Sequence, residues 1–180
     1  DLQQRELLNV LLRERRKKKW AKEIGIKWMD GMPLTTEQIR SFYDTENLQD
    51  MLNDLVEKGY LVYEYPKESE EGVRGPDSTK PKGYNIVAGK LSFEFSKILS
   101  PDELVPTLVA MDMDKMGVVD GNGIRHLSVR EGQKLCGYDP DTYDLSMIKE
   151  KEAFDLLGNT VCVPVISAIS EKIAAALKEA

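Results

Sequence analysis

The two cysteines and the single histidine are the first candidates for a nucleophile, a general base or a metal ligand: Cys136, Cys162 and His126. A reactive thiol needs a neighbouring base or cation that lowers its pKa, and a structural zinc site needs four ligands. Both cysteines stand among apolar residues instead, which is typical of small buried side chains. The sequence around His126 offers no partner for a triad or a metal site, so we expect a surface histidine. No catalytic residue and no metal site are therefore predicted in this chain.

A run of cations near the start of the chain is a second chemical feature. Seven basic residues fall within ten positions, and each could neutralise a DNA phosphate and make binding strongly dependent on salt. At helical spacing they spread around most of the helix, so a solvated surface is the alternative interpretation. The run consists of Arg13, Arg15, Arg16, Lys17, Lys18, Lys19 and Lys22, from which we take Arg16 and Lys17 as DNA-binding candidates.

The 180 residues carry a formal net charge of −6, with 41% hydrophobic and 31% charged residues, as in a soluble globular chain. Residues 1–90 contain 16 basic and 16 acidic residues, and residues 91–180 contain 9 and 15. This excludes a uniformly basic nucleic-acid coat but allows a local basic face. No apolar run approaches the roughly 18 residues of a membrane-spanning helix, and the first 20 residues do not form a signal peptide. We expect a cytoplasmic protein with no membrane partner.

Apolar residues at spacings of three and four predict helices at 3–24, at about 35–43, and from just after Asn47 to Gly59. Residues 60–65 then predict a strand. This order is that of a winged-helix domain, and a small helical subdomain with an edge strand is the alternative. The third helix has the wrong charge for a phosphate-lined groove. Its acidic residues are Glu46, Asp50, Asp54 and Glu57.

Residues 67–83 combine charges, prolines and glycines without apolar periodicity, which predicts a loop. Its length exceeds that of an ordinary connection, so we expect it to be mobile or functional. Three cations make it a further candidate for entering a DNA groove: Arg74, Lys80 and Lys82.

Two further helices are predicted near the end of the chain. Ser128 begins a helix that runs to Leu135, with Glu131 in the capping-box position. The last helix runs from about Val161 to Leu177. Its aliphatic residues recur about every four positions and form one continuous stripe: Val161, Val165, Ile166, Ile169, Ile173 and Leu177.

Two late blocks are more specific than these fold signals. Residues 125–138 read RHLSVREGQKLCGY, and residues 157–166 read LGNTVCVPVI. In order and spacing they resemble the last two conserved motifs of the DNA (cytosine-5)-methyltransferases, R-x-L-[ST]-x-R-E…L-x-G-[FY] and G-N-[STA]-V-x-V-P-V-I. Residues 105–108 (VPTL) resemble the segment that ends the family's target recognition domain. One departure is local, because Asp139 stands before Pro140 where the family has proline directly.

The resemblance implies roles for several residues. The turn before the last helix would border S-adenosylmethionine through Asn159, Thr160 and Val161. Such a turn also offers backbone N–H groups and side-chain donors to a polar ligand. Thr107 would touch a phosphate beside the flipped base. Internal ion pairs that organise the recognition domain are implied for Arg125, Arg130 and Glu131.

Other motifs of the family have no counterpart. Neither cysteine follows a proline, as the family's nucleophile does, and the glycine-rich cofactor loop and the Glu-Asn-Val triplet are missing. In the family these motifs precede the recognition domain. We therefore expect the C-terminal part of such an enzyme, as a second subunit or a truncated chain, inactive alone. It would act on double-stranded DNA with a partner chain or upstream segment that carries the catalytic motifs, in a bacterial or phage-encoded restriction-modification setting.

The expected fold is α+β. A helical, winged-helix-like part would occupy 1–66, and the recognition-domain core would occupy 67–140. Residues 141–180 would carry the C-terminal motif and a helix that packs on a Rossmann-like α/β methyltransferase domain. Two alternatives remain. A winged-helix DNA-binding regulator leaves both late blocks unexplained, and a non-catalytic methyltransferase relic would bind DNA without activating any partner.

Overall fold

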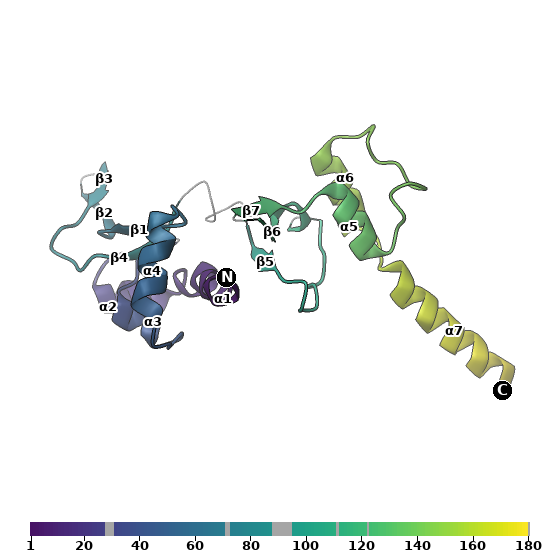
Figure 1. Ribbon diagram of the computed structural model, residues 1–180, viewed down its shortest axis with the longest axis horizontal. Helices are drawn as coiled ribbons and strands as arrows, with labels where there is room; N and C mark the ends of the chain where they lie inside the picture. Colours follow the sequence, from purple (N-terminus) through teal and green to yellow (C-terminus); the bar gives the residue numbers. More distant parts are fainter. Residues whose placement is uncertain (28–30, 71–72, 88–94, 111, 122, 180) are drawn as a thin grey trace. The chain divides into compact units, whose positions relative to one another are not determined.

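The chain divides into two compact units, Asp1–Lys97 and Ile98–Ala180. Both units combine helices with small sheets, so the expected α+β class is confirmed at this level. The computed structural model (Figure 1) describes residues 1–27, 31–70, 73–87, 95–110, 112–121 and 123–179.

The first unit begins with two helices where one was expected. The helices of this unit are α1 (Leu2–Glu14), α2 (Lys18–Ile24), α3 (Thr36–Arg40) and α4 (Leu48–Glu57). The prediction of a single helix over 3–24 is wrong, because Lys17 takes an extended backbone (φ −74°, ψ 131°) between α1 and α2. The break allows the buried Trp20 to donate its indole N–H to the Glu14 carbonyl at 2.9 Å, which satisfies an end group of α1. Apolar periodicity could not reveal the break, because both helices keep their apolar spacing.

Arg15 lies at this break and ties it to the sheet. Its side chain is only 2% exposed, and its Nη1 donates to Asn85 Oδ1 at 2.9 Å. Its carbonyl oxygen accepts the Met32 N–H at 2.9 Å. The neighbouring Arg16 and Lys17 are exposed, so the basic run contains one buried structural cation beside exposed ones.

The other two helices follow their sequence signals. Thr35 and Gln38 form a capping box at the start of α3, which ends at Arg40 rather than at the predicted Tyr43. Gly59, with φ 74°, follows α4 as expected for a helix end. The apolar face of α4 packs against β1 through buried residues of one stripe. These are Leu48, Met51, Leu52 and Leu55.

The strands of the first unit are β1 (Leu61–Glu64), β2 (Lys67–Glu70), β3 (Val73–Pro76) and β4 (Gly83–Ile86). β1 confirms the predicted strand and pairs antiparallel with β4. The prediction of a loop over 67–83 is wrong, because β2 and β3 form an antiparallel pair within it. The Asp77 N–H donates to the Pro66 carbonyl at 2.9 Å and so extends this pairing by one residue on each strand. Their sequences lack apolar alternation, so periodicity could not show these two strands.

A further backbone segment joins β4. The Leu34 N–H donates to the Tyr84 carbonyl at 3.0 Å, and the Tyr84 N–H donates to the Leu34 carbonyl at 2.7 Å. Leu34 is fully buried. The chain at Leu34, just before α3, therefore lies beside the β1–β4 ribbon, on which α4 also packs (Figure 1).

The second unit has a three-stranded sheet in the order β5–β6–β7, with β6 and β7 antiparallel. Its elements are β5 (Lys97–Leu99), the 3-10 turn η1 (Met113–Lys115), β6 (Met116–Asp120), β7 (Gly123–His126), α5 (Val129–Cys136), α6 (Glu150–Gly158) and α7 (Val163–Glu179). Ser128 and Glu131 form the predicted capping box of α5. α6 was not among the helices predicted from the sequence.

Two apolar clusters hold this unit together. Leu99, Met116 and Leu127 are buried around the sheet. The other cluster joins η1, α5 and α6, and its buried members are Met113, Cys136, Phe154 and Leu157. α5 and α6 therefore pack partly through residues of the two sequence blocks, Cys136 and Leu157.

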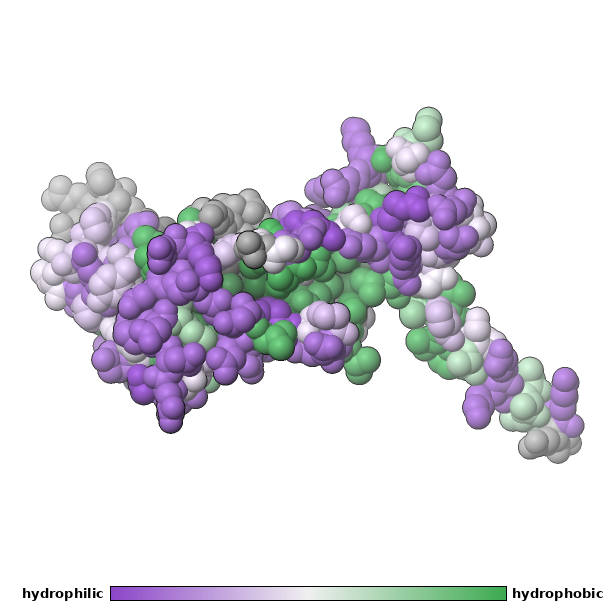
Figure 2. Space-filling view, in the orientation of Figure 1, coloured by the Kyte–Doolittle hydropathy of each residue, from purple (hydrophilic) through white to green (hydrophobic). Residues whose placement is uncertain are grey.

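α7 differs from the other helices, because its described side chains are all exposed. Figure 2 shows apolar groups along it, and Ile169, Ile173 and Leu177 are 49%, 56% and 73% exposed. By length and composition, the segment Glu150–Lys178 would suffice to cross a membrane. The search for an uninterrupted apolar run in the sequence had not indicated such a segment. The segment is divided between α6 and α7, and one such segment is weak evidence for a membrane protein.

Replacing Arg15 tests whether this cation is structural. We expect Arg15→Met to lower the free energy of unfolding of the first unit by about 1–3 kcal/mol, because it removes a buried charged donor from Asn85. Arg16→Met makes the same chemical change at an exposed neighbour and should change stability by less than about 0.5 kcal/mol. Urea unfolding followed by tryptophan fluorescence measures both variants. Equal losses in the two variants would contradict the assignment.

Candidate functional site

The VPTL segment and the LGNTV block meet in the second unit. A Cβ built at Gly158 would lie 2.2 Å from the Ala110 nitrogen and 2.6 Å from the Val109 carbonyl carbon, so these backbones are in direct contact. Leu108 packs on the cluster that contains Phe154 and Leu157. The structure thus brings together two segments that lie about fifty residues apart in the chain.

The end of α5 meets the start of α7. Gly137 has φ 84°, and a Cβ there would lie 2.2 Å from Cδ of Pro164. The Tyr138 hydroxyl lies 2.5 Å from Thr160 Oγ1, and Cys162 Sγ lies 3.8 Å from the Leu135 carbonyl oxygen. The two late sequence blocks therefore form one junction, in which the first block supplies the surface that holds the second.

The turn between α6 and α7 uses backbone groups that were expected to be free. The Asn159 N–H donates to the carbonyls of Asp155 and Leu156, both at 3.2 Å, and the Thr160 N–H donates to Leu157 at 3.2 Å. The Asn159 side-chain amide also donates to the Asp155 carbonyl, at 2.8 Å. Asn159 and Val161 remain exposed, whereas Thr160 is half-buried. A ligand at this turn would meet mainly these two exposed side chains.

Arg125 and Glu131 form a bidentate ion pair. Arg125 Nη1 and Nη2 donate to the two Glu131 oxygens at 2.9 and 2.8 Å, and Arg125 Nε donates to Asp120 at 2.7 Å. The Arg125 hydrogen bonds, together with the Ser128 backbone N–H, lower the pKa of Glu131 to about 2. The same pairs raise the pKa of Arg125. This network joins β6, β7 and the first turn of α5.

Arg130 lies on α5 and pairs with the loop that follows. Its Nη2 donates to Asp141 Oδ1 at 2.6 Å, which raises the pKa of Arg130. Nearby, the buried Gln133 donates to the Tyr143 carbonyl at 2.6 Å. Both contacts hold the loop between α5 and α6 against α5. Arg130 belongs to the first late block, whereas Gln133 matches none of its defining positions and was not predicted.

The cysteines occupy different environments. Cys136 is buried, as expected, and burial raises the pKa of its thiol. The expectation that Cys162 is buried is wrong, because it lies exposed at the start of the uncovered α7. His126 is exposed, and its Nδ1 lies 2.9 Å from the Asp114 carbonyl oxygen. Across the described residues, no group of three His, Cys, Asp or Glu side chains is placed to hold a metal ion.

The DNA-binding candidates lie in both units. Thr107 is exposed in the second unit, on a segment without helix or strand. In the first unit Arg16 and Lys17 are exposed, and Lys17 Nζ pairs with Glu14 at 2.5 Å. Lys80 is half-buried, and the exposed Lys82 lies 4.7 Å from the ring centroid of Tyr65. The side chain of Arg74 lies outside the described part of the structure, although its backbone belongs to β3.

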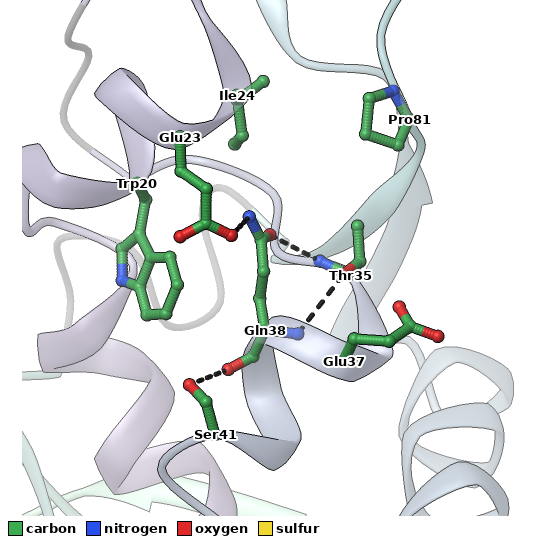
Figure 3. A pocket seen from close by; sticks show the side chains of 8 residues that line it. All are labelled: Trp20, Glu23, Ile24, Thr35, Glu37, Gln38, Ser41 and Pro81. Carbon is green, nitrogen blue, oxygen red and sulfur yellow. Dashed lines mark hydrogen bonds between the residues drawn. The ribbon is translucent and has the colours of Figure 1, made fainter.

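A cavity of about 420 Å³ lies between α2 and α3 (Figure 3). Gln38 points into it, donates to Glu23 at 2.8 Å and accepts the Thr35 N–H at 3.0 Å. The buried Trp20 forms its wall, in contact with the Phe42 ring at a centroid distance of 5.8 Å. The central polar side chain of this cavity is thus engaged in capping α3, and no sequence pattern had indicated the cavity.

Comparison with known proteins gives consistent matches. The sequence model of the family described as C-5 cytosine-specific DNA methylase matches residues 14–175. Type II methyltransferase M.NlaIV of Neisseria lactamica is 57% identical over 171 residues, which are 95% of this chain and 40% of that protein. M.NgoBV of Neisseria gonorrhoeae is 54% identical over the same shares of both proteins. M.HgiCI of Herpetosiphon aurantiacus is 36% identical over 91% of this chain and 34% of its own length.

The chain therefore spans about 40% of the length of the two Neisseria relatives that it matches. No solved structure matches the chain. The match to residues 14–175 covers parts of both units, including the two late sequence blocks.

Adding a methyl group at Gly158 tests the backbone contact. Helix propensity alone favours alanine by up to about 1 kcal/mol, but the new Cβ would collide with the Ala110 backbone. We expect Gly158→Ala to destabilise the second unit by about 1–3 kcal/mol or more. Urea unfolding followed by circular dichroism measures this. Gly75→Ala is the control, because an added methyl group there meets nothing within 4 Å; an unchanged or higher stability of Gly158→Ala would contradict the contact.

The Arg125–Glu131 pair predicts a pH dependence of stability. The folded state lowers the pKa of Glu131 from 4.5 to about 2, so the unfolded chain binds the proton more readily. The contribution is complete above about pH 4.5 and is lost as pH falls toward 2. Glu131→Gln keeps an acceptor for the Ser128 cap, and it should be less stable than the parent at pH 6.

The difference between Glu131→Gln and the parent should shrink between pH 4.5 and 2. It should be modest, because solvent screens a side chain that is 38% exposed. Urea unfolding over this pH range measures it, with Glu171→Gln on the exposed α7 as control. A difference that stays constant with pH would exclude the ionic contribution.

Proposed function

Because the chain belongs to the family of C-5 cytosine-specific DNA methylases, we propose that it is the target-recognition and C-terminal part of a DNA (cytosine-5)-methyltransferase. Its substrate would be double-stranded DNA, and its setting would be the bacterial cytoplasm as part of a restriction-modification system. The observation that carries the proposal is the junction of residues 105–110, 125–138 and 157–166 in the second unit. These are the segments whose sequences resemble the family's closing motifs.

The chemistry must come partly from outside this chain. Methylation at C5 of cytosine needs a thiolate that attacks C6, an acid beside N3 and a base flipped out of the duplex. Burial raises the pKa of Cys136, which is opposite to what a nucleophile requires. We therefore assign the thiolate and the acid to an upstream segment or a partner chain. The greater length of the relatives supports this assignment.

The α6–α7 turn would form one border of the cofactor site. Its exposed amide at Asn159 and exposed aliphatic side chain at Val161 suit a ligand with both polar and apolar parts. Bound S-adenosylmethionine would supply the methyl group. The residues of this chain would orient it along one edge, and the remaining walls would belong to the catalytic segment.

The first unit would bind DNA through a winged-helix-like arrangement. Its support is the order of the helices, the Leu34 bridge beside β4 and the β1–β4 ribbon, whose two strands are connected through the β2–β3 pair. The exposed residues of α4 include Asp50 and Glu57, so we assign groove contact to the ribbon rather than to α4. Backbone phosphates would meet the ribbon cations and the α1–α2 turn. The residues concerned are Arg74, Lys80, Lys82, Arg16 and Lys17.

Thr107 is assigned to a phosphate beside the flipped base. Thr107 is exposed, and Val109 and Ala110, which follow shortly after it, contact Gly158 at the end of α6. This contact would hold the segment that binds the phosphate. A phosphate contact fixes position and carries no sequence information. Sequence choice would therefore rest with the first unit.

Methyl transfer with and without the missing segment tests the function. We expect the purified chain alone to transfer no methyl group from labelled S-adenosylmethionine to DNA. The chain joined to the catalytic segment encoded with it should methylate C5 of cytosine, read by bisulfite sequencing. Transfer by the chain alone would overturn the division of labour. Binding of DNA without any transfer in the joined enzyme would favour the non-catalytic relic.

The exposed stripe of α7 predicts a change of order on assembly. Burying each aliphatic side chain stabilises a protein by roughly 1.5–3 kcal/mol. Covering the whole stripe would therefore add a stabilisation on the order of 10 kcal/mol that is absent while the stripe is exposed to water. We expect fast amide hydrogen exchange at residues 163–179 in the chain alone and protection once the catalytic segment is present. Full protection in an isolated monomer would contradict this.

Two variants of α7 provide controls for that measurement. Ile169→Asp places a charge in the stripe and should abolish the protection gained on assembly. Glu171→Lys changes a residue about 200° away around the helix and should keep it. The amides of α5 should remain protected in every sample, because α5 packs on α6 within the unit.

A further inference from the structure

Thr160 is turned away from the exposed edge of the α6–α7 turn. Its Oγ1 lies 2.5 Å from the Tyr138 hydroxyl, and both residues are half-buried. Its neighbours Asn159 and Val161 are exposed. The middle residue of the turn therefore faces the protein, and the two residues that flank it face outward.

Tyr138 is itself fixed by its surroundings. Its ring packs on the cluster that contains Cys136 and Phe154. The ring of Tyr143 meets it edge-on, with centroids 5.5 Å apart and planes at 80°. The Tyr143 backbone is held in turn by the hydrogen bond from the buried Gln133 to its carbonyl oxygen, at 2.6 Å. The Tyr138 hydroxyl thus projects from a rigid support.

We propose that Tyr138 is a positioning residue for the cofactor edge: its hydroxyl holds Thr160, and Thr160 in turn presents Asn159 and Val161 to the methyl donor. Thr160 then acts as an internal tie and makes no ligand contact through its hydroxyl. This inference rests on the proposed cofactor role of the turn. Neither sequence block shows the link by itself, because the two hydroxyls lie 22 positions apart.

The size of the effect follows from one hydrogen bond. The turn has two other ties to α5, at Pro164 against Gly137 and at Cys162 beside Leu135, so loss of the hydroxyl should loosen the turn without unfolding it. A single neutral hydrogen bond corresponds to a change of about 2- to 10-fold in an equilibrium constant.

The test uses the enzyme that contains the catalytic segment, with S-adenosylhomocysteine as the titrated ligand. Tyr138→Phe and Thr160→Val should each weaken binding about 2- to 10-fold, and the double variant should bind no worse than either single variant. Thr160→Ser keeps the hydroxyl and should retain parental affinity. Tyr143→Phe removes a hydroxyl from the neighbouring ring and should also leave affinity unchanged.

Two readouts distinguish the inference from the proposed function. Amide exchange at residues 159–162 should rise about 2- to 10-fold in Tyr138→Phe, whether or not ligand binds. The KM for S-adenosylmethionine should rise while kcat is unchanged. Parental exchange and affinity in Tyr138→Phe, or additive losses in the double variant, would overturn the inference. If exchange rises as expected but Asn159→Ala leaves affinity unchanged, the tie stands and the cofactor role of the turn fails.

Discussion

The contact between the Gly158 backbone and the Val109–Ala110 backbone is the constraint on which the second unit depends. No side chain fits between them, so α6 can approach the preceding segment this closely only with glycine at its end. The approach brings Phe154 and Leu157 into one cluster with Met113. It also fixes where the chain leaves α6, and therefore where the turn toward α7 can lie.

α6 and the end of α5 both engage polar groups of this turn. The backbone N–H groups of Asn159 and Thr160 bind α6 carbonyls, and the Thr160 hydroxyl binds Tyr138. What remains exposed is a small set of side chains at the turn and the aliphatic face of α7. The second unit therefore has a packed apolar core but an aliphatic helix face that nothing in the unit covers. This uncovered face is the reason to assign its function jointly with a further segment.

In the first unit, neighbouring cations have different structural roles. Arg15 is buried and binds Asn85, whereas Arg16 and Lys17 beside it are exposed. On the α4 side of the β1–β4 ribbon, the Tyr84 hydroxyl donates to Asn53 at 3.0 Å and accepts from Gln49 at 2.6 Å. Just before β4, the exposed Lys82 lies 4.7 Å from the ring centroid of Tyr65. Amino-acid composition does not distinguish a structural cation such as Arg15 from exposed cations such as Arg16 and Lys17, whereas their burial does.

The sequence by itself determined the elements whose signals are local. α4 and α5 follow from apolar spacing, a capping box and a helix-ending glycine, because each of these acts within a few residues. The late blocks likewise indicate the family through residues that stand close together in the chain. The α1–α2 break and the β2–β3 pair were not predicted, because the break keeps the apolar spacing of both helices and the two strands lack apolar alternation. α6 was not predicted either, and it packs on η1 and α5, which lie earlier in the chain.

For the site, the sequence named Asn159, Thr160 and Val161 as one group, and the tertiary structure divided them by exposure. It also decided that Cys136 is buried while Cys162 is not. The physical reason is the same in both cases. A residue type fixes which bonds a side chain can make, but burial and hydrogen-bond partners depend on which distant segments fold against it.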